Sequence, residues 1–256
     1  LGSGPGTGWA TETALGNVTP IHGQGEFTSN TDTLTEFSQQ SPHAILDWQT
    51  DIQQPAGHSL EFRQDEGFVV LNQSPGERAS DFWGRVVCDA TCIFANRAGI
   101  NFQDGSFVDV GQVIAAAGDL AHSDFLAGQY HFTGLDGRVT NAGHMQGQGI
   151  ALLGRSVANF GHVETPNGSF VMAAGNEIQL RDHNSPIVIQ SSLGAPDDLG
   201  GGPAVENTGT IEAGNGRVRL AAGDMLSFAI RNTGNIHGGS ITLEAGEGGG
   251  VEVRGV

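Results

Sequence analysis

One seven-residue pattern occurs four times in the second half of this chain of 256 residues, and it limits the possible folds more than any other feature. It consists of an apolar residue, Asn two positions later, Gly two positions after that and a closing apolar residue. The copies are residues 139–145, 157–163, 205–211 and 230–236. Their Asn residues are 18, 48 and 25 residues apart, so the middle gap is close to two repeats. A repeat of about 20 to 25 residues is expected of a solenoid in which each repeat forms one coil.

The residues after each copy alternate between apolar and polar side chains, as strands with one buried face do. In residues 217–220, for example, Val218 and Leu220 would face inward and the two arginines outward. We therefore predict an all-β, right-handed parallel β-helix with two or three short strands in each coil and about 4.8 Å between coils. Residues 187–189 are predicted to supply the strand of an unmarked coil inside the 48-residue gap.

The Asn and Gly of each copy are predicted to form the corners between strands. Asn tolerates a left-handed backbone and hydrogen-bonds its own neighbours, while Gly adopts positive φ without steric cost. Their expected role is therefore structural. The corner residues are Asn141, Gly143, Asn159, Gly161, Asn207, Gly209, Asn232 and Gly234.

The beginning of the chain differs from the rest, because a Gly-rich stretch leads into sequence rich in Thr, Ser, Asn and Gly. The predicted divisions are an arm or cap over residues 1–36, a main β-helix over 37–181 and continuing coils over 182–256, with a Pro- and Gly-rich excursion at 182–204. Trp9 is an aromatic residue in the arm, and it is a possible assembly anchor because aromatic side chains dominate many protein contacts.

Composition indicates a folded protein. With 41 Gly, 15% charged and 38% hydrophobic residues, the chain lacks both the charge density of a disordered tail and the helix formers of a bundle. Its net charge of −17 argues against nucleic acid as a partner. It contains no apolar run near 18 residues, so no membrane span is predicted. The chain begins with Leu1 rather than Met, and we expect it to derive from a longer precursor.

Five short blocks in the first half carry a family resemblance. They are AILDW at 44–48, LEF at 60–62, VVLN at 69–72, SDFWG at 80–84 and IFANRAGINF at 93–102. In this order and at these spacings they resemble the N-terminal secretion domain of filamentous-haemagglutinin-like exoproteins, the passengers of two-partner secretion. The resemblance covers roughly residues 37–181, and Trp48 and Trp83 within the blocks are predicted to be core.

The resemblance implies a secreted or surface-attached, adhesin-like β-helix of a Gram-negative-type envelope. It implies an outer-membrane transporter as partner and a possible host or cell-surface ligand. From the residues themselves we predict no catalytic activity, no cofactor and no metal. The positions that match the recognition motifs of the family are Asn72, Asn96, Gly99 and Ile100. The alternative is that these four residues only fill turns and core in the first coils.

Two other functions compete with this one. The first is a filament subunit that stacks end to end or donates its N-terminal arm as a strand, because an uncapped β-helix exposes strand edges. The second is a polysaccharide-active enzyme, for which the nearest candidates are Arg181-Asp182-His183 and Asp197-Asp198. Turn chemistry accounts for these residues, and we predict that the chain is not an enzyme.

The cysteines of the chain are Cys88 and Cys92. Four residues of extended strand span about 13 Å, whereas the Cα atoms of a disulfide lie about 4.4 to 6.8 Å apart, so a bond between them requires a turn. Export favours a local disulfide. The alternative, a redox or metal pair, lacks a second Cys or His pair nearby.

His144 and His162 directly follow the Gly of the first two copies of the pattern. On adjacent coils they would stand about 4.8 Å apart, where two imidazoles can share a metal or repel each other when protonated. The later copies have Thr210 and Asn235 at this position, which favours a plain polar column.

Phenylalanine recurs at strand-scale or coil-scale intervals, which favours aromatic rings stacked inside the solenoid over a sugar-binding stripe. The residues are Phe62, Phe68, Phe82, Phe94, Phe102, Phe107, Phe125 and Phe132.

Overall fold

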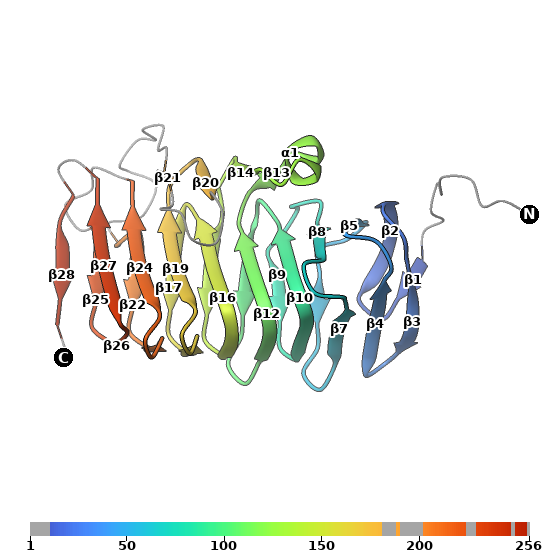
Figure 1. Cartoon of the computed structure of the whole chain (residues 1–256), viewed down its shortest axis with the longest axis horizontal. Helices are drawn as coiled ribbons and strands as arrows, with labels where there is room; N and C mark the ends of the chain where they lie inside the picture. Colours follow the sequence, from blue (N-terminus) through green and yellow to red (C-terminus); the bar gives the residue numbers. More distant parts are fainter. Residues whose placement is uncertain (1–10, 181–187, 190–201, 224–228, 247–248, 255–256) are drawn as a thin grey trace, which may run out of the picture.

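A computed structural model describes residues 11–180, 188–189, 202–223, 229–246 and 249–254. The chain forms a right-handed parallel β-helix whose coils stack along the long axis, with the N-terminal strands at one end and the last strand at the other (Figure 1). The predicted all-β fold is therefore confirmed. Within the described ranges, no helix is long and apolar enough to span a bilayer.

In these ranges the strands form sheets of 16, 8 and 4 strands. The main path of the first sheet runs through β1 (Thr11–Thr13), β2 (Gly16–His22), β5 (His43–Trp48), β8 (Val69–Gln73), β10 (Arg85–Ala95), β12 (Phe107–Ala116), β16 (His144–Gly154), β18 (His162–Glu164), β23 (Thr210–Glu212) and β26 (Asn235–His237). Its other strands are β3 (Gly25–Thr31), β4 (Leu34–Gln39), β7 (Ser59–Arg63), β19 (Ser169–Ala174), β24 (Arg217–Ala222) and β27 (Ser240–Ala245).

The second sheet closes the coils on their other side. It contains β6 (Gln53–Gln54), β9 (Ser80–Phe82), β11 (Gly99–Phe102), β15 (Arg138–Asn141), β17 (Ser156–Asn159), β22 (Val205–Asn207), β25 (Ile230–Asn232) and β28 (Val251–Val253). All its pairs are parallel and place like residues in register, as Val157, Val205 and Ile230 show. Repetition in the sequence thus becomes columns of equivalent side chains along the helix axis.

The N-terminal strands close the first coil. β1 and β2 form an antiparallel hairpin, and β2 pairs antiparallel with β5. β3 pairs antiparallel with β4, which in turn lies parallel to β7. The antiparallel strands occupy the edge that the first parallel coil would otherwise expose.

The third sheet lies outside the β-helix. It is antiparallel and consists of β13 (Asp119–Leu120), β14 (Tyr130–Thr133), β20 (Ile178–Leu180) and β21 (Val188–Ile189), beside the short helix α1 (His122–Leu126) (Figure 1). The predicted extra coil at 187–189 is therefore wrong. β22 pairs directly with β17, so the 48-residue gap is one coil with a long excursion, and its described strands β20 and β21 belong to the outer sheet.

The described residues form two apolar cores because part of the first sheet is buried on both faces. In β10, Cys92 and Phe94 face the lumen of the β-helix, whereas Ile93 and Ala95 face outward under the third sheet. The sequence is accordingly a continuous apolar run there, as in parallel strands that are covered on both sides. The alternation predicted for 217–220 applies only where the outer face is solvated.

The positions of the aromatic residues correct several predictions. Phe125 and Phe132 are buried in the outer core rather than in the lumen, because they belong to α1 and β14. Phe107 and Phe68 are only partly buried. Trp48 is core, but Trp83 follows β9 at a corner and is 47% exposed, so its prediction as core was wrong.

Candidate functional site

Asn72 ties three successive coils together at the end of β8. Its side-chain oxygen accepts a hydrogen bond from the indole Nε1 of Trp48 at 3.1 Å, and its Nδ2 donates to the carbonyl oxygen of Ile93 at 3.4 Å. The side chain is 1% exposed. Because Trp48 lies one coil before Asn72 and Ile93 one coil after it, this amide fixes the stacking of the first coils.

Asn96 is the centre of a buried polar network in the turn between β10 and β11. Its Nδ2 lies within hydrogen-bond distance of Asp51 Oδ1 (3.0 Å), the Arg78 carbonyl oxygen (3.0 Å) and Ser80 Oγ (2.8 Å). Its side-chain oxygen accepts from the backbone N–H of Ala98 at 2.9 Å. The amide therefore joins its own turn to the 78–80 segment of the preceding coil and to Asp51 in the turn after β5.

Asp51 also belongs to this network, although no pattern in the sequence indicated it. Its carboxylate accepts backbone N–H groups from Gly76 at 2.9 Å, Glu77 at 3.1 Å and Arg78 at 2.9 Å. The residue is buried, so these are charge-assisted bonds shielded from water. A lone acid in the turn after a resemblance block was the only signal in the sequence, and it is too common to identify such a role.

The network fixes the conformation of a surface segment, residues 74–78, which we call the 74–78 loop. Pro75, Glu77 and Arg78 in this loop are exposed, as is Arg97 in the neighbouring turn. Arg97 pairs with Asp136 at 3.0 Å and Asp119 at 3.4 Å. Burial raises the pKa of Asp119, and the positive charge of Arg97 partly offsets that rise.

The remaining motif residues are also inaccessible. Gly99 is buried with φ of 127°, and a Cβ there would lie 2.8 Å from the carbonyl oxygen of Arg138, so only Gly fits. Ile100 in β11 is fully buried in the lumen. In the folded chain the side chains of Asn72, Asn96 and Ile100 are buried, and among them Asn96 is hydrogen-bonded to the 74–78 loop through the carbonyl oxygen of Arg78.

Cys88 and Cys92 are joined by a disulfide with a Cα separation of 6.2 Å. An irregularity in the pairing of β10 with β12 between Cys88 and Thr91 supplies the turn that the bond requires. Both sulfur atoms belong to buried residues of the lumen, where they pack as part of the core. The bond pins the point at which β10 bends from its pairing with β7 to its pairing with β8.

Replacing both cysteines by Ala is expected to lower the free energy of unfolding by about 2 kcal/mol, because a disulfide that closes so short a loop restricts the unfolded chain only modestly. Urea denaturation of the oxidised wild type and of the double variant measures the difference. Complete loss of folding, or an unchanged midpoint, would contradict this value.

The predicted Asn corners form a buried ladder along the second sheet. Asn141 Nδ2 donates to Asn159 Oδ1 at 2.8 Å, Asn159 Nδ2 to Asn207 Oδ1 at 2.8 Å, and Asn207 Nδ2 to Asn232 Oδ1 at 2.7 Å. In the earlier coils the same column holds Phe102 and, before it, Phe82. Stacked rings therefore give way to stacked amides at Asn141.

The Gly corners are required for a different reason from the one predicted. None of the four has positive φ. Instead, the corner backbones of successive coils lie so close that a Cβ on Gly161 would be 2.0 Å from the carbonyl oxygen of Gly143. The same clash, at 2.1 and 2.0 Å, applies to Gly209 over Gly161 and to Gly234 over Gly209. Close approach of backbone to backbone thus excludes any side chain.

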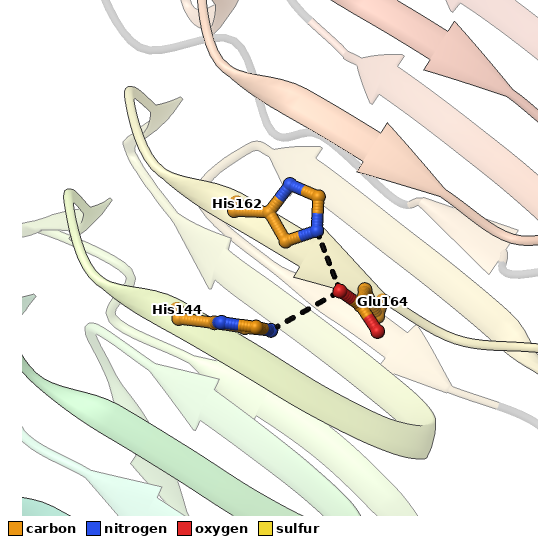
Figure 2. A group of neighbouring side chains, drawn as sticks. All are labelled: His144, His162 and Glu164. Atoms are coloured by element: carbon orange, nitrogen blue, oxygen red, sulfur yellow. Dashed lines mark hydrogen bonds and ion pairs between the residues drawn. The ribbon is translucent and has the colours of Figure 1, made fainter.

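Other predicted residues fall outside the described part of the chain. Trp9, Arg181-Asp182-His183 and Asp197-Asp198 all lie there, so the absence of enzyme activity stays a prediction. His144 and His162 do lie side by side on β16 and β18, and Glu164 joins them (Figure 2). Glu164 was missed, although a residue two positions after His162 on a strand shares its face.

The comparisons agree with this architecture. The family model of the TPS (two-partner secretion) secretion domain matches residues 22–251, which extends beyond 37–181 on both sides. The HMW1 secretion domain from Haemophilus influenzae is similar with a TM-score of 0.75 and 21% identity over 93% of this chain and 66% of that one, so the chain spans just under two thirds of its length. The filamentous hemagglutinin secretion domain has a TM-score of 0.56 and 15% identity over 93% of this chain and 99% of that one.

A search of the curated proteins finds no match. The two solved structures are less than 25% identical to the chain, so they bear on its fold, whereas the family model covers most of its length and bears on its membership. TPS secretion domains are parts of exoproteins that cross the outer membrane of Gram-negative bacteria, which places the chain at the cell surface or outside the cell. The chain belongs to the family of TPS secretion domains.

Proposed function

We propose that the chain directs a secreted or surface-attached, adhesin-like exoprotein to its outer-membrane transporter and has no catalytic role. Membership of the secretion-domain family supports export by a two-partner system. The lack of a catalytic role stays a prediction, because the candidate residues Arg181-Asp182-His183 and Asp197-Asp198 lie outside the described part of the chain. Binding of a host or cell-surface ligand stays a prediction.

The feature that the transporter reads is the 74–78 loop. The observation that carries this proposal is the burial of Asn72, Asn96 and Ile100, since buried side chains cannot contact a partner while the loop above them is exposed. Asp51 and Asn96 hold the loop in one conformation. A preordered loop loses less entropy on binding, which favours recognition of the folded first coils.

A secretion assay with the cognate transporter tests this role of the loop. Replacing Glu77 and Arg78 together by Ala is expected to lower the secreted fraction about tenfold, as loss of an interface contact of ordinary strength does. Neither side chain has a hydrogen bond or ion pair among the described residues that the substitution would break, so thermal melting should be unchanged.

The matched control for this assay is Glu26→Ala with Arg217→Ala, which also removes one exposed acid and one exposed Arg but lies away from the loop. It should be secreted like the wild type. Equal secretion of the loop variant and the control would refute recognition through the loop. If neither the wild type nor any variant were secreted in the presence of the transporter, export by this route would be refuted.

Assembly into filaments stays a prediction. Among the described residues, those of β27 and β28 include the exposed apolar side chains Ile241, Val251 and Val253. A following coil or a second subunit could cover such side chains equally well, and therefore they favour neither arrangement.

A further inference from the structure

Three potential metal ligands meet on the outer face of the β-helix, away from the 74–78 loop. His144 at the start of β16 is in register with His162 at the start of β18, and Glu164 lies two residues further along the same strand (Figure 2). The three side chains are 36%, 34% and 38% exposed, respectively, so the cluster lies at the surface of the β-helix. Residues two apart on a strand project from the same face, which is why all three converge.

The distances suit coordination of one ion. His162 Nε2 lies 2.7 Å and His144 Nε2 lies 3.5 Å from the same oxygen of Glu164, and all three ligand atoms lie within 4.8 Å of one another. Ligands about 2.0 Å from a tetrahedral zinc ion are about 3.3 Å apart. Small rotations of the side chains, without movement of the strands, would therefore bring the three atoms to coordinating positions.

Two features of the cluster favour a bound cation. The Nε2 atom of His144 is buried and makes no hydrogen bond, and it lies 3.5 Å from the carboxylate of Glu164 as an ion pair. Glu164 is in register with Glu212 on the next coil, so two carboxylates stand side by side in one column. A cation bound here would coordinate this nitrogen and lower the repulsion between the carboxylates.

The cluster is also held in place from one side. The ring of Phe107 packs edge to face against His144 with centroids 5.1 Å apart, and the two imidazoles pack in the same way at 4.9 Å. These contacts restrict the ring of His144 to the orientation in which its Nε2 faces Glu164. Preordering of ligands lowers the entropy lost on binding an ion.

We propose that His144, His162 and Glu164 bind one divalent transition-metal ion of the zinc type. Two imidazole nitrogens and a carboxylate favour zinc, copper or nickel over magnesium or calcium, which prefer oxygen ligands. Three protein ligands leave a fourth position for water. The net charge of −17 raises the local concentration of cations around the chain.

Binding of the ion ties two coils together. His144 and His162 are 18 residues apart and meet only when β16 and β18 are stacked, so the folded chain binds the ion and the unfolded chain does not. A ligand that binds only the folded state stabilises it in proportion to its concentration over its dissociation constant. The bound metal thus stabilises the stacking of two neighbouring coils, and this role is independent of recognition by a transporter.

Calorimetric titration of zinc chloride into the purified chain tests the site. We expect saturable binding of one ion per chain, and a loss of affinity of at least about 100-fold in His162→Asn and in Glu164→Gln, because each removes a direct ligand. Asn is the residue of the same column at Asn235, so His162→Asn suits the fold. His22→Asn removes an exposed imidazole from β2 in the N-terminal cap and should bind like the wild type.

Cobalt(II) provides a second readout that needs no variant. A four-coordinate site gives visible absorption that zinc displaces, whereas weak surface binding does not. Absence of saturable zinc binding by the wild type would overturn the proposal. Equal affinity of His162→Asn, Glu164→Gln and wild type, with circular dichroism showing all three folded, would overturn it as well.

Discussion

Replacing Asp51 by Ala is expected to lower the free energy of unfolding by about 4 kcal/mol. The carboxylate accepts three backbone N–H groups of the 74–78 loop and one N–H from the side chain of Asn96, and its removal leaves the three backbone donors without this partner. Hydrogen bonds to charged groups contribute about 1.5–3 kcal/mol each, and part of that loss is recovered where the loop can turn toward water. Denaturant unfolding monitored by circular dichroism measures the change.

Asp104→Ala is the matched control for this substitution, because Asp104 is an exposed acid in a turn and its loss should change stability by less than about 0.5 kcal/mol. Asp51→Asn keeps the shape of the side chain but turns an amide N–H toward a backbone donor, so an intermediate loss is expected. An Asp51→Ala variant as stable as the control would mean that the loop keeps its conformation without the carboxylate, and the framework role of the network would be wrong.

Replacing Gly209 by Ala is expected to cost about 3 kcal/mol or more. The new Cβ would lie 2.1 Å from the carbonyl oxygen of Gly161 and 2.9 Å from the side-chain amide nitrogen of Asn159. The first of these atoms is backbone and cannot move without separating two coils, so the clash breaks pairing and the amide ladder together. The measurement is again the free energy of unfolding, with thermal melting as a second observable.

Gly149→Ala is the control for this effect. Gly149 lies inside β16, and a Cβ there would meet only the flexible side chain of Gln112, with a nearest distance of 3.3 Å. We expect a change below about 1 kcal/mol. If both glycine variants were equally stable, the corners of neighbouring coils would have room to separate, and close backbone approach would not be the reason for Gly at these positions.

The sequence was sufficient for the fold wherever the repeat was regular. The Asn-Gly pattern predicted the coils, and Val218 and Leu220 face inward as expected. It was insufficient at the 48-residue gap, because spacing alone does not distinguish two short coils from one coil with an excursion. The sequence did contain a signal for the outer sheet. Residues 92–95 form an apolar run, and such a run indicates a strand that is covered on both faces.

The site residues were harder to predict because their roles depend on contacts between coils. Asn96 was identified by its resemblance to a motif, but its partner Asp51 is 45 residues away and only the stacking of coils brings them together. Glu164 was missed for a related reason, as the histidine pair was considered without the next outward position on the strand. The Gly corners were identified correctly as positions, while the closeness of stacked backbones was visible only in three dimensions.

The outer sheet divides the chain into parts of unequal cooperativity. Phe132 of this sheet and Phe125 of the adjoining helix α1 pack in one core with residues from successive coils, from Ile45 in β5 to Ala173 in β19. We therefore expect those coils to open together, whereas the strands from β22 onward contact mainly their immediate neighbours and are expected to be released coil by coil. A chain built in this way has a single rigid block near its N-terminal end and a stepwise, nearest-neighbour transition beyond it.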